Sequence, residues 1–154
     1  MVGDSNLRLC REVPFGWQIE CIPGIHLSQL KNILHHTDRT SKCLKNIVIQ
    51  AGINDRFSSR PDVESCIDAA KQPGVTIHYQ GISMSRECAT KLGSITSSNI
   101  YTINKSAKKH IGKFYINPLP PMYVTTTEPG GIHYSLNTCR DIIEGMVTAI
   151  DTLN

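Results

Sequence analysis

The sequence is poor in aromatic residues, which make up 6% of 154 residues with a single Trp, and its charge excess is only +3 at pH 7. An excess of this size permits weak attraction to phosphate or anionic lipid but requires neither partner. No uncharged apolar run approaches the ~18 residues of a membrane-spanning helix, and no basic-then-apolar leader opens the chain. We therefore expect a cytoplasmic chain.

The six cysteines include no C-x-x-C pair, so a zinc site built from them would need an unusual scaffold, and neither a metal nor an organic cofactor is predicted. Four of them, Cys21, Cys66, Cys88 and Cys139, fall in segments that have the pattern of strands or helices. We expect them to be small buried side chains in a reducing compartment. Disulfides are the alternative.

The length fits one domain, and 40% hydrophobic with 19% charged residues is typical of a globular chain. Short β-rich runs alternate with amphipathic segments, which predicts an α/β fold, a three-layer sandwich with about five parallel strands. The predicted strands are 1–2, 17–22, 46–51, 75–79 and 100–103. The predicted helices are 6–13, 26–36, 61–71 after a Ser58 or Ser59 cap, 85–92, 105–110 and 138–153. A first strand of two residues is unusually short, so we expect a single domain, 1–154, excised from a longer protein.

Glycines and polar residues follow the predicted strands. GDSN occupies 3–6, PG 23–24 and GIND 52–55, and GGIHYS at 130–135 precedes the last helix. In an open parallel sheet the ligand site lies at the carboxyl ends of the strands, so these blocks are the candidates for a site. Each block alone is equally typical of a turn or a helix cap.

Together the blocks hold the groups needed for acyl transfer. Ser5, at a strand-to-helix turn, is the candidate nucleophile, and His133 is the candidate base. The backbone N–H groups of Ser5 and Gly24 and the carboxamide of Asn54 are candidate donors to an oxyanion. Tyr123 and the PLPP loop at 118–121 are candidate walls of an acyl pocket. Asp55 and Arg56 are expected to form a surface pair.

The four blocks, in this order along nearly the whole chain, resemble the SGNH, or GDSL-type, hydrolase superfamily. In size and texture the chain is similar to the branch related to platelet-activating-factor acetylhydrolase. It is also similar to the esterase domain of the first-open-reading-frame proteins of LINE retrotransposons. The resemblance implies a flavodoxin-like topology, with Ser5 as nucleophile, His133 as base, and Ser5, Gly24 and Asn54 forming the oxyanion hole. It implies a serine esterase acting on small acyl esters, above all acetyl esters, without a cofactor or metal.

One position departs from the family pattern. The family usually has Asp three residues before its His, and here that residue is Gly130. A lost orienting carboxylate can cost ~10⁴ in turnover. The replacements considered are the Glu128 side chain, a main-chain carbonyl of 128–131, and a Ser-His dyad without an orienter. We rank the carbonyl first, because Gly130 and Gly131 free the backbone to turn an oxygen inward.

The rival interpretation is a catalytically impaired module that binds a lipid, a membrane surface, an acylated ligand or a protein partner. A third is a nucleic-acid-associated domain of a retrotransposon protein. The basic segment around Lys105, Lys108 and Lys109 is its support, and the lack of interleaved aromatic residues counts against it.

Overall fold

The structure, a computed structural model, describes residues 1–10, 12–36, 44–58 and 61–153. Within them, five parallel strands form one sheet in the order β2–β1–β3–β4–β5. The strands are β1 (Val2–Gly3), β2 (Glu20–Cys21), β3 (Asn46–Gln50), β4 (Thr76–Gln80) and β5 (Tyr115–Ile116). This confirms the predicted α/β class, and the strand order is the flavodoxin-like one.

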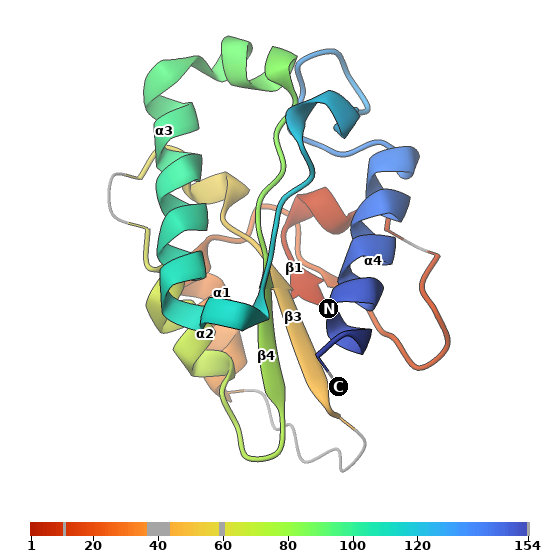
Figure 1. Cartoon of the computed structure of the whole chain (residues 1–154). Coiled ribbons are helices and arrows are strands. Elements are labelled where there is room, and N and C mark those ends of the chain that lie inside the picture. Colours follow the sequence, from red (N-terminus) through yellow and green to blue (C-terminus); the bar gives the residue numbers. More distant parts are fainter. Residues whose placement is uncertain (11, 37–43, 59–60, 154) are drawn as a thin grey trace.

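Helices cover both faces of the sheet, which gives three layers (Figure 1). One face carries α1 (Leu27–His36), α2 (Val63–Ala70) and α3 (Arg86–Ile111), and the other carries α4 (Leu136–Asp151). Strand side chains alternate between faces, so Ile47 and Ile49 of β3 pack with the first three helices and Val48 packs with α4. This two-sided burial explains why β3 has a continuous apolar sequence.

The helices α1 and α4 follow their predicted apolar stripes. Leu27, Leu30 and Leu34 of α1 are buried at helical spacing. Ser135 caps α4, because its hydroxyl accepts a hydrogen bond from the Thr138 N–H at 3.3 Å. The predicted stripe of α4 is buried along Ile142, Ile143, Met146 and Ile150, with Val147 partly buried. Leu153 was expected in this stripe, but it is 38% exposed and lies beyond the end of α4.

The prediction of a fifth strand at 100–103 is wrong, because these residues lie in α3. Ile100 and Ile103 are buried three residues apart, on the inner side of that helix. The predicted helices 85–92 and 105–110 belong to the same element, which bends at Gly93, where φ is +82°. The fifth strand is instead β5, whose two residues are too few to show a pattern.

Three shorter predictions also need correction. The predicted helix 6–13 is only a 3₁₀ turn, η1 (Ser5–Leu7), and the predicted strand 17–22 shrinks to β2. The residue before α2 is Asp62, not Ser58, and Ser59 lies outside the described residues. The PLPP loop leads into another 3₁₀ turn, η4 (Pro121–Tyr123).

Burial is confirmed for most of the cysteines that were predicted to be buried. Cys66, Cys88 and Cys139 are buried, as predicted, whereas Cys21 is only partly buried. Cys10 is also buried, and all five described cysteines are free thiols, while Cys43 lies outside the described residues. Among the described helices, none is both long and apolar enough to cross a membrane.

Gly3 permits the close contact between β1 and β3. A Cβ atom at this position would lie 2.0 Å from the Gln50 carbonyl oxygen and 2.8 Å from Leu7 Cδ1.

We predict that Gly3→Ala lowers the free energy of unfolding by about 3 kcal/mol, at the upper end of the cost of overpacking, because a backbone atom must move. Urea unfolding measures the change. The control is Gly145→Ala on the exposed side of α4, where nothing lies within 4 Å of the new Cβ. This variant should gain up to ~1 kcal/mol, and equal losses in both would contradict the prediction.

Candidate functional site

The turn that follows β1 carries Ser5 and is held to the turn after β3 by Asp4. The Asp4 side chain is fully buried. Its Oδ1 accepts a hydrogen bond from the Asn6 N–H at 3.0 Å. Its Oδ2 accepts from the N–H groups of Gly52 and Ile53 at 3.1 and 3.2 Å. One carboxyl group therefore joins the GDSN and GIND blocks, which are far apart in the sequence.

The environment of Asp4 favours its protonated form. Burial raises the pKa of this carboxyl to about 6, against the opposing effect of the three backbone hydrogen bonds. The negative charge of Asp55 adds a smaller upward effect. Asp4 thus changes its charge near pH 6 in the folded protein.

The turns after β2 and β3 are joined by Asn54. Its Nδ2 donates a hydrogen bond to the carbonyl oxygen of Ile25 at 3.0 Å, one residue after Gly24. Gly24 has a φ of +76°, a conformation that residues with a side chain rarely adopt. The structure therefore brings the Gly24 and Asn54 turns together, and Asp4 brings the Ser5 turn to the Asn54 turn.

Asp55 and Arg56 do not form the expected surface pair. Asp55 is 11% exposed at its side chain. Its Oδ2 accepts a hydrogen bond from the Leu27 N–H at 2.9 Å, at the start of α1. Arg56 donates to the Ile53 carbonyl at 2.9 Å and lies over the ring of Phe57. Asn54 and Asp55 of the GIND block thus contact the loop after β2 and the start of α1.

His133 lies just before α4, and its neighbour Tyr134 reaches the carboxyl edge of the sheet. The Tyr134 hydroxyl donates to the Ser83 carbonyl and accepts from the Ser83 N–H, both at 2.9 Å. Burial, with a smaller contribution from the negative charge of Asp4, raises the pKa of Tyr134. The charge of Asp4, the residue before Ser5, therefore acts on the Tyr134 hydroxyl.

The structure does not join Ser5 directly to His133. Ser5 is 7% exposed and begins η1. In the described part of the chain, no hydrogen bond links its hydroxyl to the imidazole, and the buried Nδ1 of His133 has no hydrogen-bond partner. The two side chains thus belong to segments at one edge of the sheet that no described hydrogen bond between Ser5 and His133 joins.

None of the expected orienting groups is bonded to His133 Nδ1. No main-chain carbonyl of 128–131, the acceptor ranked first, binds this atom, and the Glu128 carbonyl accepts instead from the Thr126 hydroxyl at 2.6 Å and the Gly131 N–H at 2.9 Å. The Glu128 side chain is exposed. Gly130 has a φ of +66°, and a Cβ on it would lie 3.1 Å from the Lys91 side chain. An aspartate at this position would be strained and directed toward α3.

A small apolar groove lies beyond the carboxyl end of β4. Its volume is about 240 Å³, and its walls include Ile82, Met84, Leu119 and Pro118. The PLPP loop therefore lines a groove, but none of Ser5, Gly24, Asn54 and His133 lines it, so its role as a wall of an acyl pocket stays a prediction. Tyr123, the other expected wall, is largely exposed and does not line this groove.

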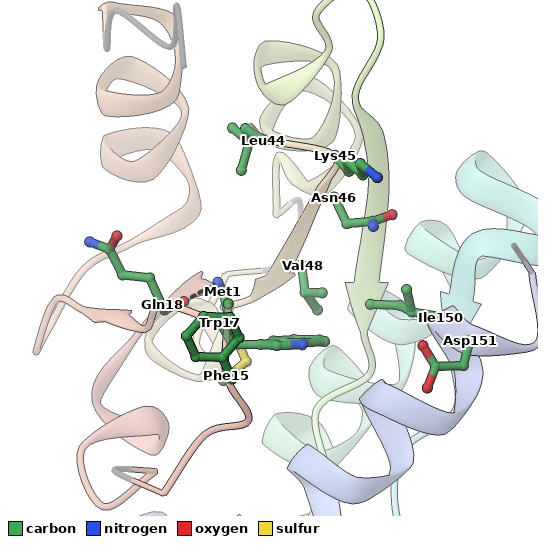
Figure 2. Close-up of a pocket in the computed structure, with 11 residues that line it drawn as sticks. Met1, Phe15, Trp17, Gln18, Leu44, Lys45, Asn46, Val48, Ile150 and Asp151 are labelled. Carbon is green, nitrogen blue, oxygen red and sulfur yellow. Dashed lines mark hydrogen bonds between the residues drawn. The ribbon is translucent and has the colours of Figure 1, made fainter. Parts of the chain in front are cut away.

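A second hollow lies at the opposite edge of the sheet, where the strands begin. It has a volume of about 510 Å³. Figure 2 shows Trp17 and Phe15 on one side of it, with Asn46 and Val48 of β3 and Ile150 of α4 around it. None of the candidate site residues lines this hollow, and parallel sheets bind ligands at the other edge.

Comparison of the sequence with protein-family models and with curated proteins gives no match. Within the described residues, no group of three or more His, Cys, Asp or Glu side chains could hold a metal ion.

The central role of Asp4 is not evident from the amino-acid sequence. The GDSN block is as typical of a helix cap as of a turn, and the hydrogen bond from the Asn6 N–H to the Asp4 side chain is such a cap. The bonds to Gly52 and Ile53 span nearly 50 residues, and nothing in the spacing indicates them. The role of Tyr134 was not predicted either. Nor were the buried side-chain amides of Asn6 and Gln50, whose nitrogen and oxygen atoms have no hydrogen-bond partner.

We predict that Asp4 makes the fold less stable as pH rises from about 4 to about 6. The folded pKa of about 6 exceeds the unfolded value of ~3.9, so in this window the folded state binds a proton that the unfolded state has lost. The stabilisation is complete below the window and is lost as pH rises through the folded pKa, up to about 3 kcal/mol.

Urea unfolding of the native chain and of Asp4→Asn between pH 4 and 7 measures this effect. Asparagine cannot titrate, so the variant should lack this part of the slope, whatever its overall stability. Asp141→Asn, at an exposed position on α4, should keep the native slope. The same pH slope in Asp4→Asn as in the native chain would refute the assignment.

Proposed function

We propose that the protein is a serine esterase that hydrolyses small acyl esters, above all acetyl esters, through an acyl-enzyme intermediate. The observation that carries this proposal is the pair of links at the carboxyl edge of the sheet. Asp4 binds the N–H groups of Gly52 and Ile53, and Asn54 binds the Ile25 carbonyl. These bonds gather the turns that carry Ser5, Gly24 and Asn54. The resemblance of the four sequence blocks to SGNH hydrolases points the same way.

In the proposed reaction, Ser5 Oγ attacks the ester carbonyl and His133 accepts the serine proton. The oxyanion that forms accepts hydrogen bonds from the backbone N–H groups of Ser5 and Gly24 and from Asn54 Nδ2. Asn54 Nδ2 carries two hydrogens and gives one to Ile25, so the other is available. His133 then passes its proton to the leaving alcohol, and water hydrolyses the acyl-enzyme by the same route in reverse.

The lack of an acceptor at His133 Nδ1 lowers the turnover expected of the esterase. An orienting acceptor fixes the tautomer of a catalytic imidazole and stabilises its charged form, and its loss can cost ~10⁴ in turnover. His133 has no such acceptor among the described residues. We therefore propose a slow Ser-His dyad rather than a triad.

The same observation favours a second candidate, a catalytically impaired binding module for an acylated ligand, a lipid or a protein partner. The apolar groove beside Met84 and Leu119 would receive the apolar part of such a ligand. The support for nucleic acid binding is weaker, because Lys108 already donates to Asn117 at 3.3 Å and lies over the Tyr115 ring.

We predict that Ser5→Ala and His133→Ala each reduce hydrolysis of p-nitrophenyl acetate to the buffer rate, because each variant removes one member of the dyad. The absorbance of the released p-nitrophenolate measures the rate of hydrolysis. Ser98→Ala and His36→Ala, at exposed positions on α3 and α1, are matched controls and should keep the native rate. A native rate equal to that of Ser5→Ala would exclude the esterase and leave the binding module.

We predict that Glu128→Gln keeps most of the activity, because the exposed Glu128 side chain makes no hydrogen bond to His133 Nδ1. Comparison of kcat for Glu128→Gln and His133→Ala on the same ester tests this. If the Glu128→Gln variant loses as much as His133→Ala, then Glu128 replaces the missing aspartate in solution and the dyad is wrong.

A further inference from the structure

The hollow at the edge where the strands begin is of a size that holds small molecules. Its volume of about 510 Å³ lies within the range of ligand pockets. Figure 2 shows the Trp17 indole below Val48 of β3, with Ile150 of α4 beside them. Val48 and Ile150 belong to the hydrophobic cluster under α4, and Trp17 packs against that cluster. The apolar wall of the hollow is therefore continuous with the core.

The Trp17 indole has both a polar group and ring surface to spare. Its side chain is only partly buried. Among the described residues, no hydrogen bond involves the indole N–H and no other aromatic ring pairs with the indole. Phe15, on the same segment before β2, also lines the hollow and is fully exposed. Exposed aromatic rings of this kind favour contact with another planar ring.

Asn46, at the start of β3, supplies a hydrogen-bond donor. Its Oδ1 accepts a hydrogen bond from His78 Nε2 at 2.9 Å. Because an amide oxygen can only accept, His78 carries a proton on Nε2. Burial lowers the pKa of His78 and so favours the neutral imidazole. The Nδ2 group of Asn46 has no partner in the part of the chain that the structure describes, and Asn46 lines the hollow.

Two charged side chains line the hollow from opposite sides. Lys45 precedes β3, and Asp151 ends α4. Neither forms an ion pair with another described residue. The amino group of Met1, which also lines the hollow, donates to the Gln18 carbonyl at 2.6 Å. An electronegative group of a ligand is therefore favoured beside β3, near Lys45, and disfavoured beside the Asp151 carboxylate.

We propose that this hollow binds a planar aromatic compound that carries a carbonyl or carboxylate oxygen at one edge. The ligand ring lies against the Trp17 indole, and the ligand oxygen accepts a hydrogen bond from Asn46 Nδ2. Val48 and Ile150 contact the apolar remainder of the ring. The site is at the opposite edge of the sheet from Ser5, so it does not depend on the proposed esterase activity.

Other classes of small ligand fit these groups less well. An aliphatic chain would displace water from Asn46 Nδ2 and from the Trp17 N–H without replacing the lost hydrogen bonds. A cationic ligand would meet the same two donors and the Lys45 ammonium. A planar ring with an acceptor oxygen satisfies both the ring surface and the donor.

Titration of the full chain with sodium benzoate, followed by heteronuclear N–H correlation NMR, tests the site. Trp17 is the only tryptophan, so its indole N–H gives a single, unambiguous signal. We expect a saturable shift of this signal and of the Asn46 side-chain amide. We also expect nuclear Overhauser contacts from the benzoate ring protons to the methyl groups of Val48 and Ile150.

Cyclohexanecarboxylate is the matched control ligand. It has the charge and the number of carbon atoms of benzoate, but its ring is not planar. It should bind about fivefold more weakly, because it cannot make the aromatic contact with Trp17.

Three variants separate the donor from the general charge. Asn46→Asp keeps an acceptor for His78 Nε2 but replaces the donor with an anionic oxygen, so it should abolish the saturable shift. Asn137→Asp makes the same charge change at an exposed position at the opposite end of α4 from the hollow, and it should bind benzoate as the native chain does. Asp151→Asn should bind about twofold more tightly, because it removes an exposed carboxylate from the hollow.

Three results would overturn the proposal. They are a Trp17 signal that benzoate does not shift, equal affinities for benzoate and cyclohexanecarboxylate, and Overhauser contacts to Met84 and Leu119 of the other groove instead. If Asn46→Asp does not fold, comparison of the two ligands on the native chain still decides the question. Benzoate binding in a chain without esterase activity would support this site and refute the proposed function, so the two failures are distinguishable.

Discussion

The carboxyl edge of this protein depends on one buried carboxyl group, that of Asp4, which accepts hydrogen bonds from three backbone N–H groups. Two of these donors, Gly52 and Ile53, begin the turn after the central strand. Without an acceptor, each buried N–H would cost about 1–3 kcal/mol. The contact therefore fixes the turn after β1 against the turn after β3, and with it the position of Ser5.

The turn after β3 connects the remaining segments of the edge. Asn54 binds the Ile25 carbonyl and Asp55 binds the Leu27 N–H, so the loop after β2 and the start of α1 are both held by it. Gly52 makes the turn possible, since its φ is +118° and a Cβ there would lie 3.1 Å from Ile82. The thiols of Cys21 and Cys139 donate hydrogen bonds to the carbonyl oxygens of Asp4 and Asn6, the two residues that flank Ser5.

The sequence predicted the parallel sheet, α1 and α4, because β3 is apolar on both faces and these helices have regular apolar stripes. The strand β5 was not predicted, because two residues are too few to show an alternating pattern. Residues 100–103 were predicted as a strand because they include β-branched side chains, which also occur inside helices such as α3. The turns that carry Ser5, Gly24 and Asn54 are joined at one edge of the sheet, whereas no hydrogen bond among the described residues joins Ser5 to His133. The Asp4 bonds and the free Nδ1 of His133 depend on contacts between distant segments, which spacing along the chain does not reveal.

Labelling with a p-nitrophenyl alkylphosphonate tests the central claim most directly, because an activated serine nucleophile attacks phosphorus and keeps the phosphonyl group. The native chain is treated with the reagent, and the modified residue is located by peptide mass spectrometry. The Asp4-anchored turn predicts a single phosphonyl group, attached to Ser5. An unlabelled Ser5 in a folded, fully reduced chain, or a label on another residue, would contradict the account.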